Sequence, residues 1–295
     1  MRILSVGIAT LDIINTVAAY PLEDEELRAL EHRVARGGNA TNTLVVLSQF
    51  GHACSWAGTI ADEPDSRYIL DDLTRYGIDL SHLVHHASSK VPTSYVVLSR
   101  ESACRSIVHY RDLPEYSAAD FSAINPAEFD WIHFEGRNPS ETLQMLQRMK
   151  EDFPQVGCSL EVEKPRAGID ALLALPDVLF FSKVFAERRG HADAASLLMA
   201  MRECNPQALL FCAWGDGGAW MLKADGGMRH QPAIQPAELV DTLGAGDVFN
   251  AGVIDGLLRE NSYDKVLMQA VRLAGIKCGQ VGFGMKKPGH YDPVF

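Results

Sequence analysis

Short apolar runs alternate along this chain with longer stretches in which apolar residues recur at helical spacing. The runs contain few polar residues, which is typical of strands that a parallel sheet buries on both faces. This strand-helix-strand order favours an α/β fold with a mostly parallel central sheet and helices on both of its faces. The predicted strands lie at Met1–Ala9, Cys54–Ile60, Trp131–Phe134, Val156–Val162, Val178–Phe181 and Ala208–Trp214.

The first predicted helix has the clearest signals. Ala40, Leu44 and Leu47 fall on one helical face. Asn39 is expected to cap the start of this helix, and Gly51 stands where a helix commonly ends. Further helices are predicted at Asp65–Tyr76, Ser140–Asp152, Asp193–Glu203, Ala245–Arg259 and Asp264–Val281.

Two segments interrupt this order. Val91–Tyr110 predicts a hairpin, because two alternating stretches flank a turn at Arg100–Ala103. Ile13–Ala35 is ambiguous, since its apolar residues suit either a helix or a strand. The helical spacing is that of Leu27, Leu30 and Val34, and the strand spacing is that of Leu30, His32 and Val34.

The charge balance excludes several classes of partner. The chain has 27 basic and 38 acidic residues, a net charge of −11, so we expect no binding to nucleic acid or to an anionic membrane. The longest uncharged stretch, Gly37–Ala61, is too polar for a membrane-spanning helix. The six cysteines form no C-x-x-C pair, and Asp12 interrupts the N-terminal apolar run too early for a signal peptide. We therefore expect reduced thiols and a cytoplasmic protein.

The stretch Val240–Ala251 carries most of the chemistry, and it reads V-D-T-L-G-A-G-D-V-F-N-A. Its glycines stand immediately before a helix, where backbone N–H groups and the helix dipole together bind an anion. A carboxylate at an anion site, here Asp247, suits a base that takes a proton from an attacking hydroxyl, which predicts phosphoryl transfer. The alternative is a plain strand-to-helix turn that Asp247 caps.

A second glycine turn opens the first predicted helix, with the sequence R-G-G-N-A-T-N at Arg36–Asn42. Asn39 and Asn42 are three residues apart and so share one helical face. Amides both donate and accept hydrogen bonds, which suits a ligand with several hydroxyl groups. An N-cap beside a solvent-facing Asn would leave the same pattern.

Both motifs resemble the signatures of the ribokinase-like sugar kinases, the phosphofructokinase-B (pfkB) family of carbohydrate kinases. Shorter stretches narrow the resemblance to the branch of that family that phosphorylates ketohexoses. They lie at Asp12, Tyr20-Pro21, Asp24, Trp131–Asn138, Glu161–Arg166, Cys212–Trp214 and Lys277–Gly279. The resemblance implies one ribokinase-like α/β domain over residues 1–295. It favours strands in the ambiguous segment, so that residues of about 13–36 and 90–112 form a small β-sheet lid.

The resemblance also implies roles for individual residues. Asp247 would be the catalytic base, beside an anion hole formed by the N–H groups of Gly244, Ala245 and Gly246. The residues expected to bind the sugar are Asp12, Gly38, Asn39 and Asn42, with Asp24 reaching the sugar of a neighbouring subunit. The residues expected near the nucleotide are Arg105, Gly215, Asp216, Gly217 and Gly218. From the residues alone, a solvated charge is the favoured interpretation of Arg105, and a plain hairpin that of the glycine turn.

Other charged residues have less certain roles. Glu135, Arg137 and Lys164 stand at or beyond the ends of predicted strands, where open α/β sheets bind ligands. Support of the site and ordinary ion pairing explain them equally well. The histidines show no metal-ligand spacing, and the N-x-x-E motif of many family members is missing from Phe181–Glu187. We therefore assign no metal to protein side chains and expect Mg²⁺ to arrive with ATP.

These features predict a kinase that transfers the γ-phosphate of MgATP to a primary hydroxyl of a sugar. By resemblance, the sugar would be a ketohexose such as fructose and the hydroxyl that of carbon 1. A kinase for ribose, keto-deoxygluconate or adenosine stays open, and so does a non-catalytic sugar-binding protein. The uncovered apolar face of the expected lid predicts a homodimer through the lid. The sequence leaves open whether potassium is a further cofactor.

Overall fold

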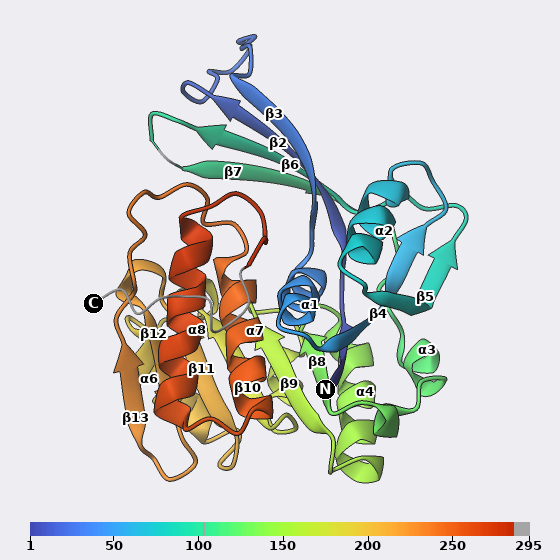
Figure 1. Cartoon of the computed structure of the whole chain (residues 1–295), viewed down its shortest axis with the longest axis vertical. Coiled ribbons are helices and arrows are strands. Elements are labelled where there is room, and N and C mark those ends of the chain that lie inside the picture. The colour runs from blue at the N-terminus through green and yellow to red at the C-terminus, as the bar shows by residue number, and fades with distance from the viewer. Residues whose placement is uncertain (103, 286–295) are drawn as a thin grey trace.

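The computed structural model describes residues 1–102 and 104–285. Two separate sheets organise this part of the chain (Figure 1). From one edge to the other, the strands of the larger sheet are β13 (Met228–Gln231), β12 (Ala219–Leu222), β11 (Leu209–Ala213), β10 (Val178–Ser182), β9 (Gly157–Val162), β8 (Trp131–Glu135), β1 (Arg2–Val6), β4 (Ala53–Ala61) and β5 (Asp79–His86). Neighbours from β11 to β5 pair in parallel, whereas β12 and β13 pair antiparallel.

All six strands predicted for this sheet are present, as β1, β4, β8, β9, β10 and β11. The remaining three strands were not predicted. β5 is an edge strand that mixes histidine and serine with leucine and valine, so it lacks the apolar run of a strand buried on both faces. β12 and β13 have four residues each, which is too short to show a pattern.

Helices cover both faces of the larger sheet, as the alternation predicts. One face carries α1 (Asn39–Gln49), α2 (Ser66–Arg75), α7 (Ala245–Leu258) and α8 (Tyr263–Cys278). The other carries α3 (Ala118–Ser122), α4 (Pro139–Asp152), α5 (Lys183–Arg188) and α6 (Ala194–Arg202). Three short 3₁₀ helices are η1 (Pro126–Glu128), η2 (Ile169–Leu172) and η3 (Gly215–Gly217). The predicted cap of α1 was wrong: Gly38 is the N-cap, and Asn39 is the first helical residue.

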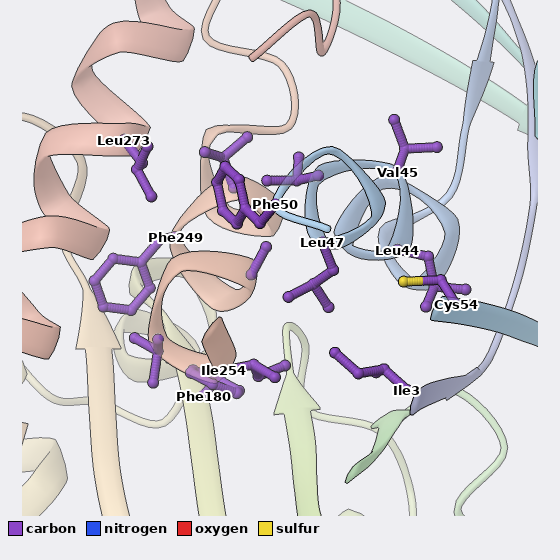
Figure 2. Close-up of a cluster of buried hydrophobic side chains, with 14 of the residues drawn as sticks. Ile3, Leu44, Val45, Leu47, Phe50, Cys54, Phe180, Phe249, Ile254 and Leu273 are labelled. Atoms are coloured by element: carbon purple, nitrogen blue, oxygen red, sulfur yellow. The ribbon is translucent and has the colours of Figure 1, made fainter. Parts of the chain in front are cut away.

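Two hydrophobic clusters hold these layers together, one on each face of the larger sheet. In the first cluster, Ile3 and Phe180 of the sheet pack with Leu47 of α1 and Phe249 of α7 (Figure 2). α1 and α7 also contact each other directly. Close packing of these helices fixes the relative position of their N-terminal ends, where both glycine motifs lie.

The smaller sheet has the strand order β3 (Glu31–Gly37), β2 (Thr10–Val17), β6 (Thr93–Ser99) and β7 (Arg105–Tyr110). Strands in the ambiguous segment are thus confirmed, and the helical alternative is wrong. β6 and β7 form the predicted hairpin, although Ala103 of its turn lies outside the described residues. Residues paired across this sheet share a face, so Asp12 and Ser94 lie on one face and Tyr95 and Val108 on the other.

Candidate functional site

The N-terminal ends of two helices meet above the carboxyl ends of the central strands. Gly38 and Gly244 are the N-caps of α1 and α7, and their φ angles are 103° and 80°. Glu135 ends β8, and Glu161 lies one residue before the end of β9. Open α/β sheets bind ligands at this edge, and helix N-termini attract anions. The two glycine motifs are therefore brought together at a place suited to an anionic ligand.

Asp247 lies in the first turn of α7 and is only 5% exposed. Asn42 Nδ2 donates a hydrogen bond to Asp247 Oδ2 over 2.7 Å. Burial raises the pKa of Asp247 to about 8, and the charges of Glu135 and Glu163 add to the rise, whereas the Asn42 hydrogen bond and the Arg36 charge oppose it. A carboxyl group with a pKa near neutral pH is suited to accept a proton from a substrate.

Arg36 sets the orientation of the Asn42 amide. Arg36 Nη1 donates to Asn42 Oδ1 over 2.6 Å, so the amide NH₂ group is the end that faces Asp247. Arg36 Nε pairs with Asp72 Oδ2 of α2 at 2.8 Å, and the arginine is buried. Sequence reasoning named Arg36 only as the start of the glycine motif, because nothing in the sequence shows which group its guanidinium meets.

Asp12 lies in β2, beside the glycine turn that opens α1. Thr10 Oγ1 donates to Asp12 Oδ1 over 2.9 Å. A Cβ atom on Gly37 would stand 2.2 Å from Asp12 Oδ2, so only glycine at position 37 permits this approach. Burial raises the pKa of Asp12, and hydrogen bonds with Thr10 and Ser94 oppose the rise. Ser94 Oγ in turn lies 3.2 Å from His109 Nδ1, on the same face of the smaller sheet.

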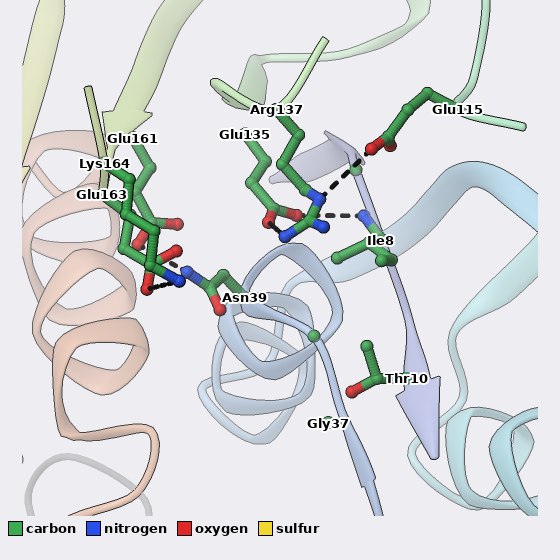
Figure 3. A network of polar contacts seen from close by, with 12 residues as sticks. Ile8, Thr10, Gly37, Asn39, Glu115, Glu135, Arg137, Glu161, Glu163 and Lys164 are labelled. Carbon is green, nitrogen blue, oxygen red and sulfur yellow. Dashed lines mark hydrogen bonds and ion pairs between the residues drawn. The ribbon is translucent and has the colours of Figure 1, made fainter. Parts of the chain in front are cut away.

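Asn39 points toward the sheet and not back along its own helix. Its Nδ2 donates to Glu161 Oε1 of β9 over 2.9 Å (Figure 3). Glu161 Oε2 is buried without a hydrogen-bond partner. Burial and the charge of Asp247 raise the pKa of Glu161 well above its usual range. Sequence reasoning missed Glu161 as a site residue, although an acid inside the buried strand GCSLEV was the available signal.

A group of charged side chains lies near Asn39, and it contains Glu135, Arg137 and Lys164 (Figure 3). Glu135 Oε2 accepts a hydrogen bond from the Ile8 N–H over 3.0 Å. Arg137 Nη1 lies 3.5 Å from Glu135 Oε1, and its Nε lies 3.4 Å from a carboxylate oxygen of Glu115. Lys164 pairs with Glu163 at 3.1 Å. The ion pairs expected at the strand ends are thus present, and they border the site.

A cavity of about 350 Å³ adjoins the Gly244–Gly246 turn, which is within the size range of small-molecule sites. Its lining is mostly apolar, with Ile234 and Phe249 among the side chains. Six of the predicted residues line it, namely Arg105, Gly215, Asp216 and Gly218 and, from the anion turn, Ala245 and Gly246. Gly217 lies in the same η3 turn without lining the cavity. Arg105 Nη1 donates to Thr242 Oγ1 over 3.1 Å, so β7 meets the loop that leads into α7.

Asp24 is not brought to these residues within one chain. It lies exposed, with φ 65°, in the connection between β2 and β3. Asp12 pairs with Ala35 near the opposite end of the same two strands. Asp24 therefore lies at the far tip of the smaller sheet, away from the site of its own chain.

No group of three or more His, Cys, Asp or Glu side chains in residues 1–102 and 104–285 could hold a metal ion. Phe181–Glu187 runs from β10 into α5, and Ser182 Oγ caps that helix by accepting from the Phe185 N–H. A short helix thus begins within this segment. No helix in the described part of the chain is long and apolar enough to cross a bilayer.

Comparison with known proteins gives four likenesses, each of which spans most of the chain. Residues 1–288 match the model of the pfkB family carbohydrate kinases. Ketohexokinase of Mus musculus is 40% identical over 290 residues, which cover 96% of this chain and 97% of that protein. A putative ribokinase from Agrobacterium tumefaciens has a TM-score of 0.84 at 23% identity, covering 95% of this chain and 92% of that one. Ribokinase of Arabidopsis thaliana, solved with ribose and ATP, has a TM-score of 0.80 at 20% identity, covering 95% and 93%.

Proposed function

This chain belongs to the pfkB family of carbohydrate kinases and is an ATP-dependent sugar kinase, and from this premise we propose that it phosphorylates the 1-hydroxyl of a ketohexose such as fructose. The family and the ribokinase-like fold predicted from the two glycine motifs are confirmed. The identity of 40% with mouse ketohexokinase supports the choice of sugar.

Asp247 acts as the general base in this proposal. The observation that carries it is a buried carboxylate of raised pKa, aimed by Asn42 and set in the first turn of α7 beside a cavity. Asp247 removes the proton of the sugar hydroxyl as the oxygen attacks the γ-phosphate. The N–H groups of Gly244, Ala245 and Gly246 then stabilise the charge that develops on the transferred group.

The sugar binds between the start of α1 and the smaller sheet. Its hydroxyl groups hydrogen-bond to Asp12, Asn39 and Asn42 and to the backbone of Gly38, which offer both donors and acceptors. The smaller sheet, residues 10–37 and 93–110, then acts as a lid over the sugar. Exclusion of water matters here, because water in place of the sugar would convert phosphoryl transfer into ATP hydrolysis.

ATP fits the cavity beside the anion turn. The apolar lining around Phe249 suits the adenine base, and the η3 turn with Gly215, Asp216, Gly217 and Gly218 borders it. Arg105 supplies the positive charge expected near the phosphates. Mg²⁺ use follows from the family, and bound Mg²⁺ would supply neutralisation of the phosphate charge. Activation by potassium stays a prediction, which activity in potassium and sodium salts would test.

The test of this function is ADP release by the purified protein with MgATP and a panel of sugars. The panel contains fructose, tagatose, ribose, glucose, keto-deoxygluconate and adenosine, and the phosphorylated carbon is then identified. We expect strong turnover of fructose at carbon 1. Turnover of another member alone would keep the kinase chemistry and reject the ketohexose. No turnover at all would favour a non-catalytic sugar-binding protein.

The pH dependence of kcat/KM should show the raised pKa of Asp247. Burial raises the pKa of Asp247 to about 8, and a general base works only in its deprotonated form. Because kcat/KM reports the free enzyme, it should fall about tenfold for each pH unit below that pKa and level off above it. Steady-state kinetics between pH 6 and 9 measure this. A profile that is flat over this range would contradict a base of raised pKa.

The smaller sheet also supports the proposal of a homodimer. Tyr95 and Val108 are directly paired on its outer face, where they are 49% and 70% exposed, and Tyr110 nearby is 51% exposed. An apolar face of this kind favours association, which could bring Asp24 of one chain toward the sugar of the other. We expect a dimer in sedimentation at micromolar concentration, with Val108→Asp shifting it toward monomer. A monomeric parent protein would refute this assembly.

A further inference from the structure

Lys277 is a fully buried lysine near the end of α8, and the mechanism above leaves it without a role. Its side chain is 0% exposed. A buried ammonium group is costly unless hydrogen bonds and opposite charge satisfy it. The burial of this charged side chain therefore calls for an explanation from its contacts.

Within the described part of the chain, the polar contacts of the Lys277 ammonium group are with oxygen atoms. Its Nζ donates to the carbonyl oxygen of Asp241 over 2.9 Å and to that of Gln280 over 3.3 Å, and it lies 3.5 Å from Asp241 Oδ2. The ring of Phe283 lies 5.7 Å away, within the range of a cation–π contact. Two carbonyl oxygens that accept hydrogen bonds, a carboxylate of opposite charge and an aromatic face together favour the protonated amine. The surrounding loops thus enclose a cation.

The same cation holds the loop that leads into the anion turn. Asp241 Oδ1 accepts a hydrogen bond from the Leu243 N–H over 2.9 Å, one residue before Gly244. Asp241 Oδ2 also pairs with Arg33 of β3 at 3.1 Å. Lys277 therefore contacts both the backbone carbonyl and the side-chain carboxylate of Asp241, the residue that holds this loop in shape.

The Phe283 ring lies between the Lys277 ammonium group and the Gly244–Gly246 turn. A Cβ atom added to Gly244 would stand 2.3 Å from the Phe283 ring, so the ring packs directly against that glycine. The Arg36 guanidinium lies 5.7 Å from the centre of the same ring. One aromatic ring is thus in contact with Lys277, with the turn, and with the arginine that orients Asn42.

We propose that Lys277 is a positioning residue whose ammonium group serves as a built-in cation, which holds residues 241–246 in the shape that binds the transferred phosphoryl group. It touches neither substrate and acts through Asp241, Leu243 and Phe283. This role rests on the proposed function of the anion turn. Without the side chain, the same three oxygens would form an empty cage for a small cation of the ammonium type.

The test is chemical rescue of Lys277→Ala. We expect kcat to fall about 10- to 100-fold, since small displacements of a catalytic group have effects of this size, while the KM for the sugar changes much less. Ammonium chloride should restore most of the lost kcat in a saturable manner. Tetramethylammonium chloride at equal ionic strength should not, because this ion is too large and has no N–H group.

Two control variants test whether the effect comes from the charge of Lys277. Lys277→Met keeps the volume and loses the charge, so we expect reduced kcat without rescue. Lys265→Ala removes an exposed lysine from the same helix and should keep the parent kcat. A folded Lys277→Ala or Lys277→Met protein with the parent kcat would overturn the proposal, and so would equal rescue by both salts.

A second readout is independent of turnover. Ammonium should raise the Tm of Lys277→Ala relative to tetramethylammonium, because a ligand that binds only the folded state stabilises it. It should leave the Tm of the parent protein and of Lys265→Ala unchanged. If the parent protein turned over no sugar, the proposed function would fall, and this Tm difference would still decide whether Lys277 fills a cation site. Absence of the difference would refute the built-in cation.

Discussion

Asp247→Asn should lower kcat about 10²- to 10⁴-fold, the usual contribution of a general base. The substitution removes the proton acceptor and keeps the size of the side chain. The hydrogen bond from Asn42 Nδ2, now 2.7 Å from Asp247 Oδ2, would be retained by an amide oxygen at the same place. Packing around the start of α7 should therefore be preserved, and the loss should fall on the chemical step.

Two measurements separate this outcome from a loss of folding. Sugar binding by calorimetry should stay close to that of the parent protein, because a loss confined to the transition state lowers kcat without weakening the ground-state complex. Asp71→Asn, which changes an exposed aspartate of α2, is the matched control and should keep the parent rate. An Asp247→Asn enzyme at near-normal rate would remove Asp247 from the role of base.

Gly244→Ala should lower kcat by about 10²- to 10³-fold, the scale of a damaged oxyanion hole. Gly244 has φ 80°, where an L-residue is disfavoured by about 1–2 kcal/mol. Its new Cβ atom would also stand 2.3 Å from the Phe283 ring. The turn must move to relieve this contact, and its N–H groups would no longer converge on one point.

The turn between β12 and β13 offers a close control. Gly226 has φ 82°, and a Cβ atom there would meet no atom within 4 Å. Gly226→Ala therefore carries the same backbone strain without a clash and far from the anion turn, so it should lower Tm and keep kcat. Equal kcat values for the two variants would show that the contact between Gly244 and Phe283 has no catalytic consequence.

Local signals in the sequence were sufficient for the central strands and for both glycine turns. A strand buried on both faces has few polar residues, and two glycine motifs in the order of the family signature together favoured an anion site over plain turns. Asn39 was wrongly predicted as a cap, because Gly38 takes that place and the amide instead meets Glu161. Capping preference is a local property, whereas the partner of Asn39 comes from β9, far along the chain.

Non-local contacts explain the other omissions. Lys277 belongs to a stretch that carries the family resemblance, but only the fold shows its contacts, because it brings Asp241, Gln280 and Phe283 around the side chain. The role of Arg36 in orienting Asn42 likewise follows only from its contacts with Asp72 and Asn42 in the fold. Strands β2 and β3 could be chosen over a helix only through the family resemblance, since a half-exposed sheet leaves a weak pattern.

The hydrogen bond between Asn42 and Asp247 joins residues 205 positions apart. Ribosomes make a chain from its N-terminus, so the sugar side of the proposed site is complete long before α7 emerges. A truncated product that ends before residue 244 would lack the proposed base, the anion turn and the part of the cavity lining that α7 and α8 supply. If Asp247 and the anion turn have the proposed roles, unfinished chains would transfer no phosphoryl group until synthesis of the whole protein is almost complete.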